Sequence, residues 1–176
     1  IVSEDMKSRI GEISTGDTEI FTFPIPDGEA GKTSATLLQL WNWLGAAGFT
    51  RNDVVIAIGG GATTDFGGYV AASWLRGIDW IAVPTTVAGM VDAAVGGKTA
   101  INSEYGKNLI GAFHSPIAVV IDFSWLQTLS DRDYAAGLAE VVKAGFIEDG
   151  VILDLLRGKN LGEIRADQER CREVFT

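Results

Sequence analysis

Three consecutive glycines at positions 59–61 directly follow a short apolar run at 54–58, and this junction limits the possible folds more than any other sequence feature. A short, β-branched run bounded by glycine is typical of a strand buried on both faces of a sheet. The residues after the glycines, FGGYVAASWLRG, have helix-like spacing as far as Gly77. A strand, a glycine turn and a helix in this order indicate a parallel α/β sheet, with ligand sites at the carboxyl ends of its strands.

The rest of the chain divides into an α/β part and a helical part. Further strands are predicted at 19–26, 80–86 and 117–122, and a helix at 34–47 that Gly48 closes. After Leu129 the pattern turns helical, with a capping-type start at Ser130 or Asp131, and no strand pattern returns. We expect a Rossmann-like parallel-sheet domain over residues 1–129 and the start of an α-helical domain over residues 130–176.

Composition and chain ends narrow the class of protein. The chain begins at Ile1 rather than Met and stops in a helical pattern without a cap, so we expect it to be part of a longer protein. Its formal charge of −9 argues against nucleic acid or an anionic membrane surface as the main partner. No uninterrupted apolar stretch reaches the roughly 18 residues of a membrane span. The single cysteine, Cys171, allows no intrachain disulfide, which suits a reducing cytoplasm.

The glycine turn itself indicates a phosphate-binding backbone. Glycines after a buried strand expose N–H groups to a phosphate at the N-terminus of the next helix. The sequence GGGATTD is neither a complete GxGxxG, because Thr64 occupies the sixth position, nor a Walker loop. By itself the turn favours a phosphate or dinucleotide site over a purely structural tight turn.

A second candidate site lies in the segment 83–116. It places Asp92, Lys98, Lys107 and Asn108 among glycines and small residues, just after a predicted strand. Lysine offers a compact charge and three donors to a phosphate or an ionised hydroxyl, and asparagine adds a neutral donor and acceptor. The alternative is a long hairpin whose lysines lie in water.

Glu140 and Lys143 lie three residues apart on one face of a predicted helix. They are either a plain intrahelical ion pair or a carboxylate metal ligand beside a lysine that faces substrate. The local pattern alone favours the ion pair.

Taken together, three stretches resemble the 3-dehydroquinate synthase family of the sugar-phosphate cyclase superfamily, in its N-terminal portion only. They are GGGATTDFGGYVAASWLRG, then VPTTVAGMVDAAVGGKTAINSEYGKNLIGAFHSP, then GLAEVVKAG. The resemblance is close from about residue 54 to 150, and PDGEAGKT is the clearest earlier match. The pair GGKTAIN and GKNLIGAF is its most specific element.

The resemblance implies a phosphate-eliminating carbon–oxygen lyase of the shikimate pathway. Such an enzyme converts 3-deoxy-D-arabino-heptulosonate 7-phosphate, a phosphorylated C7 sugar acid, to 3-dehydroquinate and phosphate. It implies a recycled NAD and a divalent metal, zinc or cobalt, that polarises the oxygen being oxidised. The helical part would then be the start of an α-helical metal-binding domain, and the enzyme a homodimer.

The resemblance also assigns residues. Those expected to contact NAD are Asp27, Glu29, Lys32, Gly60, Gly61, Asp65, Thr85, Thr86, Thr128 and Asp133. At the substrate, Lys98 and Asn108 are expected to contact the phosphate, and Asp92 and Lys143 the hydroxyls. Lys107 is expected between cofactor and substrate. Lys98 and Lys107 are also expected to contact the cofactor. Glu140 matches the carboxylate metal ligand, and Arg76 an arginine that reaches the phosphate site of a partner subunit.

One departure from the family pattern concerns the metal. The family uses two histidines from a later part of the helical domain, whereas the sole histidine here, His114, lies upstream of Glu140. We expect His114 to have a structural or loop role and the isolated chain to be inactive. Two alternatives stay open: another sugar-phosphate cyclase, and a non-catalytic nucleotide-binding fragment.

Overall fold

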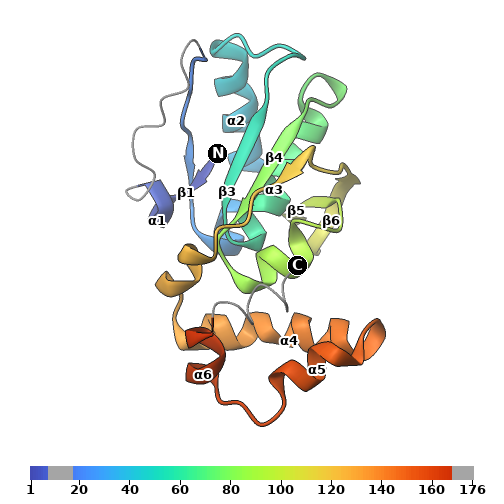
Figure 1. Cartoon of the computed structure of the whole chain (residues 1–176). Helices are drawn as coiled ribbons and strands as arrows, with labels where there is room; N and C mark the ends of the chain where they lie inside the picture. The colour runs from blue at the N-terminus through green and yellow to red at the C-terminus, as the bar shows by residue number, and fades with distance from the viewer. Residues whose placement is uncertain (8–17, 168–176) are drawn as a thin grey trace.

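A five-stranded parallel sheet forms the centre of the molecule (Figure 1). The structure, a computed structural model, describes residues 1–7 and 18–167. The sheet has the order β2-β1-β3-β4-β7. Its strands are β1 (Val2–Ser3), β2 (Pro24–Ile25), β3 (Val55–Gly59), β4 (Trp80–Pro84) and β7 (Ala118–Val119). This parallel sheet with its helices confirms the predicted Rossmann-like α/β class.

The strand order reverses between β1 and β3. The chain passes from β1 to β2 on one side and returns to place β3 on the other side of β1. In open α/β sheets, ligands bind outside the carboxyl ends of the strands at such a switch point. The end of β3, where the three glycines lie, is therefore the favoured place for a site.

Two long helices follow strands of this sheet. A short α1 (Glu4–Lys7) and the 3-10 helix η1 (Gly28–Gly31) precede α2 (Ser34–Ala46), and α3 (Gly61–Ser73) runs into the 3-10 helix η2 (Trp74–Arg76). The side chain of Thr33 caps α2 by accepting a hydrogen bond from the Thr36 N–H at 3.1 Å. Gly48 follows in the left-handed region, with φ +72°, as the sequence predicted for the end of this helix.

Helix α3 packs between the parallel sheet and an antiparallel hairpin, formed by β5 (Lys98–Ser103) and β6 (Gly106–Phe113). A Cβ at Gly67 would lie 2.5 Å from the Ala57 Cβ in β3. A Cβ at Gly68 would lie 2.5 Å from the Thr99 Cγ2 in β5. Because real side chains do not approach so closely, both sheets need glycine at these helix positions.

The helical segment packs against the loop after β4. That loop carries the π-helix η3 (Gly89–Ala93). The helical segment begins with the 3-10 helix η4 (Phe123–Thr128) and continues with α4 (Asp131–Ile147), α5 (Gly150–Leu156) and α6 (Leu161–Ala166). Val87 and Met90 share one core cluster with Tyr134 and Val141 of α4. Ser130, one of the two starts that the sequence left open, caps α4 by accepting from the Asp133 N–H. A division into domains near residue 130 stays a prediction.

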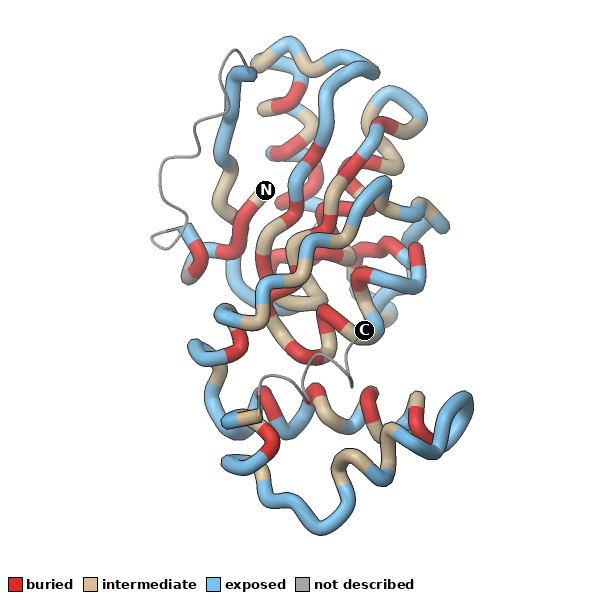
Figure 2. The backbone as a smooth tube through the Cα atoms, viewed as in Figure 1, coloured by how far each residue is buried: buried red, intermediate tan, exposed pale blue. Residues whose placement is uncertain are grey.

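Several sequence expectations need correction. The strands expected at 19–26 and 117–122 are only two residues long each, and β1 was not predicted. Strand β3 is not buried on both faces, because Ile56 is 39% exposed. In Figure 1, the helices α2 and α3 lie behind the sheet. Figure 2, in the same view, shows exposed stretches of chain along the front face of the sheet in the described ranges. Helix α3 begins at Gly61, earlier than its spacing suggested.

Two expectations fall partly outside the described residues. Cys171 and the end of the last helical pattern lie beyond residue 167. Within residues 1–7 and 18–167, no helix is both long and apolar enough to cross a membrane.

The close packing of α3 predicts the effect of one methyl group. Gly67→Ala should lower the free energy of unfolding by about 1–3 kcal/mol, because its Cβ would overlap Ala57. Gly45→Ala in α2 is the matched control: its Cβ would meet only the Trp74 ring at 3.4 Å, so helix propensity should make it neutral or stabilising by up to about 1 kcal/mol. Urea unfolding of the full-length protein measures both, and equal effects of the two variants would contradict the packing argument.

Candidate active site

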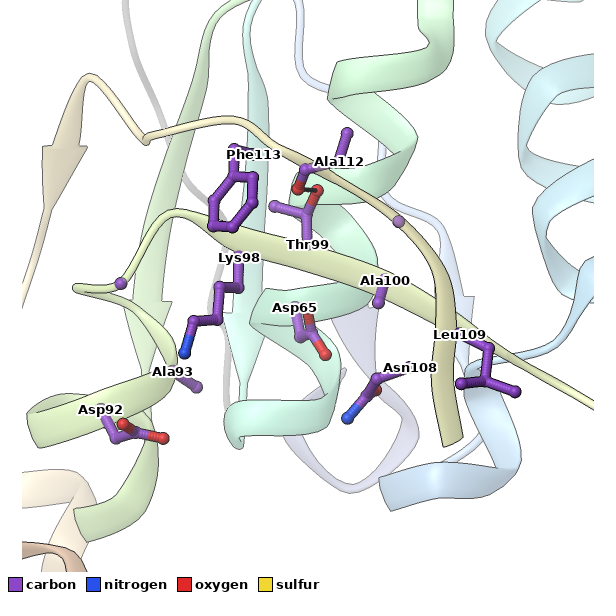
Figure 3. A pocket seen from close by; sticks show the side chains of 12 residues that line it. Asp65, Asp92, Ala93, Lys98, Thr99, Ala100, Asn108, Leu109, Ala112 and Phe113 are labelled. Atoms are coloured by element: carbon purple, nitrogen blue, oxygen red, sulfur yellow. Dashed lines mark hydrogen bonds between the residues drawn. The ribbon is translucent and has the colours of Figure 1, made fainter. Parts of the chain in front are cut away.

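A cleft of about 540 Å³ lies where the first turn of α3, the π-helix η3 and the β5–β6 hairpin meet. Figure 3 shows its lining side chains at close range. The polar ones are Asp65, Asp92, Lys98, Thr99 and Asn108. Four of the five were expected at a site from the sequence. The fold therefore brings the glycine-turn segment and the 83–116 segment to one cleft.

The glycine turn holds the start of α3 next to the end of β4. Gly59 ends β3 with φ +156°, and Gly60 is the N-cap of α3 without a side-chain cap. The first N–H groups of an α-helix have no intrahelical partner and carry its positive dipole end. A Cβ on Gly60 would lie 3.1 Å from the Thr86 Cγ2, so the strand end and the helix start are almost in contact. This backbone suits an anion such as a pyrophosphate.

A buried lysine ties three segments together beside the cleft. Lys32, at the end of η1, is 2% exposed. Its ammonium forms an ion pair with Asp65 of α3 and donates a hydrogen bond to the Asn108 Oδ1 of β6. The nucleotide-contact role assigned to Lys32 stays a proposal, and within the described structure its ammonium contacts these two side chains.

Burial dominates the electrostatics of this pair. Desolvation raises the pKa of the Asp65 carboxyl, although the hydrogen bond and the charge of Lys32 both act to lower it. The attraction thus offsets only part of the cost of burying the carboxylate. This is the usual balance for a buried ion pair, which adds little net stability but is costly to break.

Asn108 has a backbone conformation that few residues adopt. Its φ is +58°, in the left-handed region, where asparagine is one of the tolerated residues. Its N–H donates to the Asn102 Oδ1 at 3.0 Å, and the Asn102 Nδ2 donates to the Glu29 Oε2 at 2.6 Å. Sequence analysis gave Asn102 no role, since nothing in the local pattern pairs it with a residue 73 positions away.

A second charged cluster joins the π-helix to α4. Lys143 forms an ion pair with Glu140 on its own helix, and its Nζ lies 3.4 Å from the Asp92 Oδ1. The hydrogen bond with Glu140, followed by the charge of Asp92, raises the pKa of Lys143. The intrahelical pair favoured by the sequence is present, and Asp92 extends it across two elements. A π-helical turn is often found at functional sites.

Glu140 directs one buried carboxylate oxygen at Lys143. Its Oε2 is shielded from solvent and forms the ion pair with the Lys143 ammonium. A glutamate carboxylate is a common metal ligand, so Glu140 fits this role if the lysine gives up its place beside the oxygen. Residues 1–7 and 18–167 hold no group of three or more His, Cys, Asp or Glu side chains suited to binding a metal.

The remaining predicted residues are placed unevenly. Thr85 is buried and Thr86 half-buried at the end of β4, whereas Asp27, Lys107, Thr128 and Asp133 are exposed and do not line the cleft. The Thr128 hydroxyl donates to the Trp125 carbonyl at 2.7 Å, and Asp133 belongs to the cap of α4.

Arg76 lies at the far end of α3 from the cleft. It is exposed and left-handed, with φ +68°. The His114 Nε2 lies 2.8 Å from the Ile78 carbonyl close to this turn, which agrees with the structural role expected for the histidine.

A Rossmann-like sheet with a charged cleft beside the helix that follows β3 defines a nucleotide-binding type of α/β domain. The chain matches the family described as 3-dehydroquinate synthase N-terminal over residues 22–136, and it belongs to that family. A 3-dehydroquinate synthase from Thermobifida fusca (strain YX) is 54% identical over 163 residues, which are 93% of this chain and 44% of that protein. The chain thus spans less than half the length of this relative, and the family resemblance is confirmed.

Solved structures of related enzymes share the fold. The 2-epi-5-epi-valiolone synthase from Streptomyces hygroscopicus subsp. jinggangensis 5008, with NAD+ and Zn2+ bound, aligns with a TM-score of 0.90 at 31% identity. The alignment covers 99% of this chain and 51% of that one. A 2-deoxy-scyllo-inosose synthase complexed with carbaglucose-6-phosphate, NAD+ and Co2+ aligns with a TM-score of 0.65 at 36% identity, covering 69% of this chain and 33% of that one.

The buried ion pair predicts a pH-dependent effect. Because the folded-state pKa of Asp65 is raised, its contribution to stability is present below about pH 4 and is lost as pH rises through that pKa. Lys32→Met removes two of the interactions that lower this pKa, the hydrogen bond and the charge of the lysine, so the loss of stability should extend to higher pH. We expect the free energy of unfolding of Lys32→Met to be about 3–5 kcal/mol below that of the unmodified protein at pH 7.5. The difference should be smaller at pH 4.5.

Urea unfolding of the full-length protein at both pH values measures this deficit. Lys159→Met, at an exposed lysine, is the control and should change stability little at either pH. A deficit for Lys32→Met that does not grow with pH would contradict the assignment to Asp65.

Proposed function

We propose that the full-length protein is a 3-dehydroquinate synthase, a lyase that converts 3-deoxy-D-arabino-heptulosonate 7-phosphate to 3-dehydroquinate and phosphate. The observation that carries the proposal is the cleft, in which Lys98 and Asn108 lie with Asp92 beside the start of α3. In Figure 3, Lys98 projects from β5 into the space between Asp92 and Asp65. Family membership and 54% identity to a 3-dehydroquinate synthase support it.

NAD fits the backbone at the end of β3. Gly60 and Gly61 let the start of α3 lie close to Thr86 and Ala93, and the first N–H groups of the helix would face the pyrophosphate. NAD supplies a hydride acceptor that later returns the hydride, so the overall reaction is redox-neutral. The other proposed contacts are Asp27, Glu29, Lys32, Asp65, Thr85, Thr86, Lys98, Lys107, Thr128 and Asp133.

The substrate would lie on the hairpin side of the cleft. Lys98 supplies a point charge and Asn108 an amide for the substrate phosphate. Asp92 and Lys143 would orient hydroxyl groups, since each already contacts the other across the two elements. Lys107 would lie between substrate and cofactor.

Glu140 would hold a divalent metal, zinc or cobalt, together with ligands outside the described residues. The metal supplies Lewis acidity at the substrate oxygen. Its binding would take the Glu140 carboxylate away from Lys143 and leave the ammonium free to face substrate. Arg76 would serve the phosphate site of a partner subunit in a cytoplasmic homodimer.

Two other functions stay as alternatives. The cyclases aligned above, at 31% and 36% identity, are the observation that favours another sugar-phosphate cyclase. A non-catalytic nucleotide-binding fragment is the second, because Glu140 is the only metal-ligating residue proposed within the described part.

Phosphate release tests the function directly. The full-length protein with NAD and zinc should release one phosphate for each 3-dehydroquinate formed, whereas the isolated chain should bind NAD weakly and release none. Coupled phosphate detection and the absorbance of the product measure the two yields. Turnover of a different cyclase substrate in preference to this one, or turnover by the isolated chain, would contradict the proposal.

Lys98 and Glu140 should have separable roles. In the full-length enzyme at saturating metal, Lys98→Ala should make the binding free energy of a phosphonate substrate analogue less favourable by about 1.5–3 kcal/mol. This is the loss expected for a hydrogen bond to a charged group. Glu140→Gln should instead lower the metal content without substrate, because an amide is a poorer ligand. Calorimetry and elemental analysis measure these effects. Intact analogue affinity with an empty metal site in Lys98→Ala would overturn the assignments.

A further inference from the structure

Asn102 connects the loop before α2 with the residue proposed to bind the substrate phosphate. It lies near the end of β5 and is half-buried. Its backbone N–H donates to the Lys32 carbonyl at 2.8 Å, and its side-chain Nδ2 donates to the Glu29 Oε2 at 2.6 Å. Its Oδ1 accepts from the Asn108 N–H at 3.0 Å. One residue therefore makes three hydrogen bonds that reach two segments of the chain.

The chemistry of these partners fixes the orientation of the amide. A backbone N–H can only donate, so the oxygen of Asn102 must face Asn108. A carboxylate can only accept, so the amide nitrogen must face Glu29. Aspartate at this position would keep the first bond and set two carboxylates against each other at the second. Serine or alanine would lose the reach to Glu29.

Both segments that Asn102 joins need an external restraint. η1 is a single 3-10 turn, and Gly28 before Glu29 has φ +58°. Asn108 has a left-handed backbone conformation, and its side chain accepts from the buried Lys32. Asn102 and Lys32 therefore hold Asn108 from its backbone and its side chain, respectively. Both of these restraints lead back to the loop 27–32.

We propose that Asn102 is a positioning residue that couples occupancy of the nucleotide side, at Glu29, to the presentation of Asn108 in the cleft. This inference rests on the proposed function, in which Glu29 contacts NAD and Asn108 contacts the substrate phosphate. An anion held by Asn108 orders the start of β6, the Asn102 amide and Glu29 together. The loop 27–32 then needs less ordering when the nucleotide binds, which makes binding of the two ligands cooperative.

The test measures this cooperativity in the full-length enzyme. Calorimetry gives the Kd of NAD with and without saturating inorganic phosphate, the product of the proposed reaction. In the unmodified enzyme we expect phosphate to lower the Kd of NAD about five-fold or more. NAD should lower the Kd of phosphate by the same factor. Asn102→Asp should reduce this ratio to less than about two-fold, because it replaces the bond to Glu29 with repulsion.

A compensating variant separates coupling from a general loss of structure. In the double variant Asn102→Asp with Glu29→Gln, the new amide can donate to the new carboxylate, so the bond returns with its polarity reversed. The logarithm of the ratio of the two NAD dissociation constants measures the coupling. The double variant should recover more than half of the decrease in this logarithm that Asn102→Asp causes. Asn42→Asp, at an exposed position in α2, makes the same chemical change away from the site and should leave the ratio unchanged.

The outcomes distinguish this inference from the proposed function. If the unmodified enzyme turns over but shows a ratio of one, or if Asn102→Asp retains the full ratio, the coupling is wrong and the function stands. Failure of the double variant to restore the ratio also overturns the coupling through Glu29. If the unmodified enzyme neither binds NAD nor releases phosphate, the proposed function and the inference fail together.

Discussion

The close approach of α3 to two sheets is the constraint on which the rest of the structure depends. Gly67 faces β3 and Gly68 faces β5, and neither contact leaves space for a methyl group. Since the axis of α3 is fixed from both sides, its first turn is held at the end of β3, where the strand order reverses. The hairpin packs against the same helix, so Asp65 and Asn108 both line the cleft and both contact Lys32.

The site combines one buried and one exposed charged cluster, and burial gives them different properties. Lys32 is buried and Asp65 half-buried, so separating them would leave a charge without a partner in a poorly solvated place. Lys143, Asp92 and Glu140 are far more accessible, with Lys143 about half exposed, so water can replace their mutual contacts at small cost. The first cluster is therefore the more fixed of the two, and the second can exchange partners more easily.

The two clusters also belong to different parts of the chain. The buried one joins η1, α3 and the hairpin, all within the α/β part. The exposed one joins η3 to α4, where Gly137 lets the helix approach Val87 closely. Asp65 of the first cluster and Asp92 of the second both line the cleft.

The sequence by itself determined the class of fold and most of the residues at the cleft. Short apolar runs, glycines and helical spacing are local features of the sequence, and they located β3, β4 and α4 and the presence of α3, but not its start. Asp65, Asp92, Lys98 and Asn108 were likewise recognisable from the motifs that contain them. Strand lengths were overestimated because they depend on pairing: β2 pairs only with β1, and β7 only with β4. Tertiary structure alone decided that Lys32 is a buried counter-ion, that Asn102 links Glu29 to Asn108, and that one face of the sheet is left uncovered within the described residues. These features join residues tens of positions apart, and hydrogen bonding and burial over such separations leave no periodic signal in a sequence.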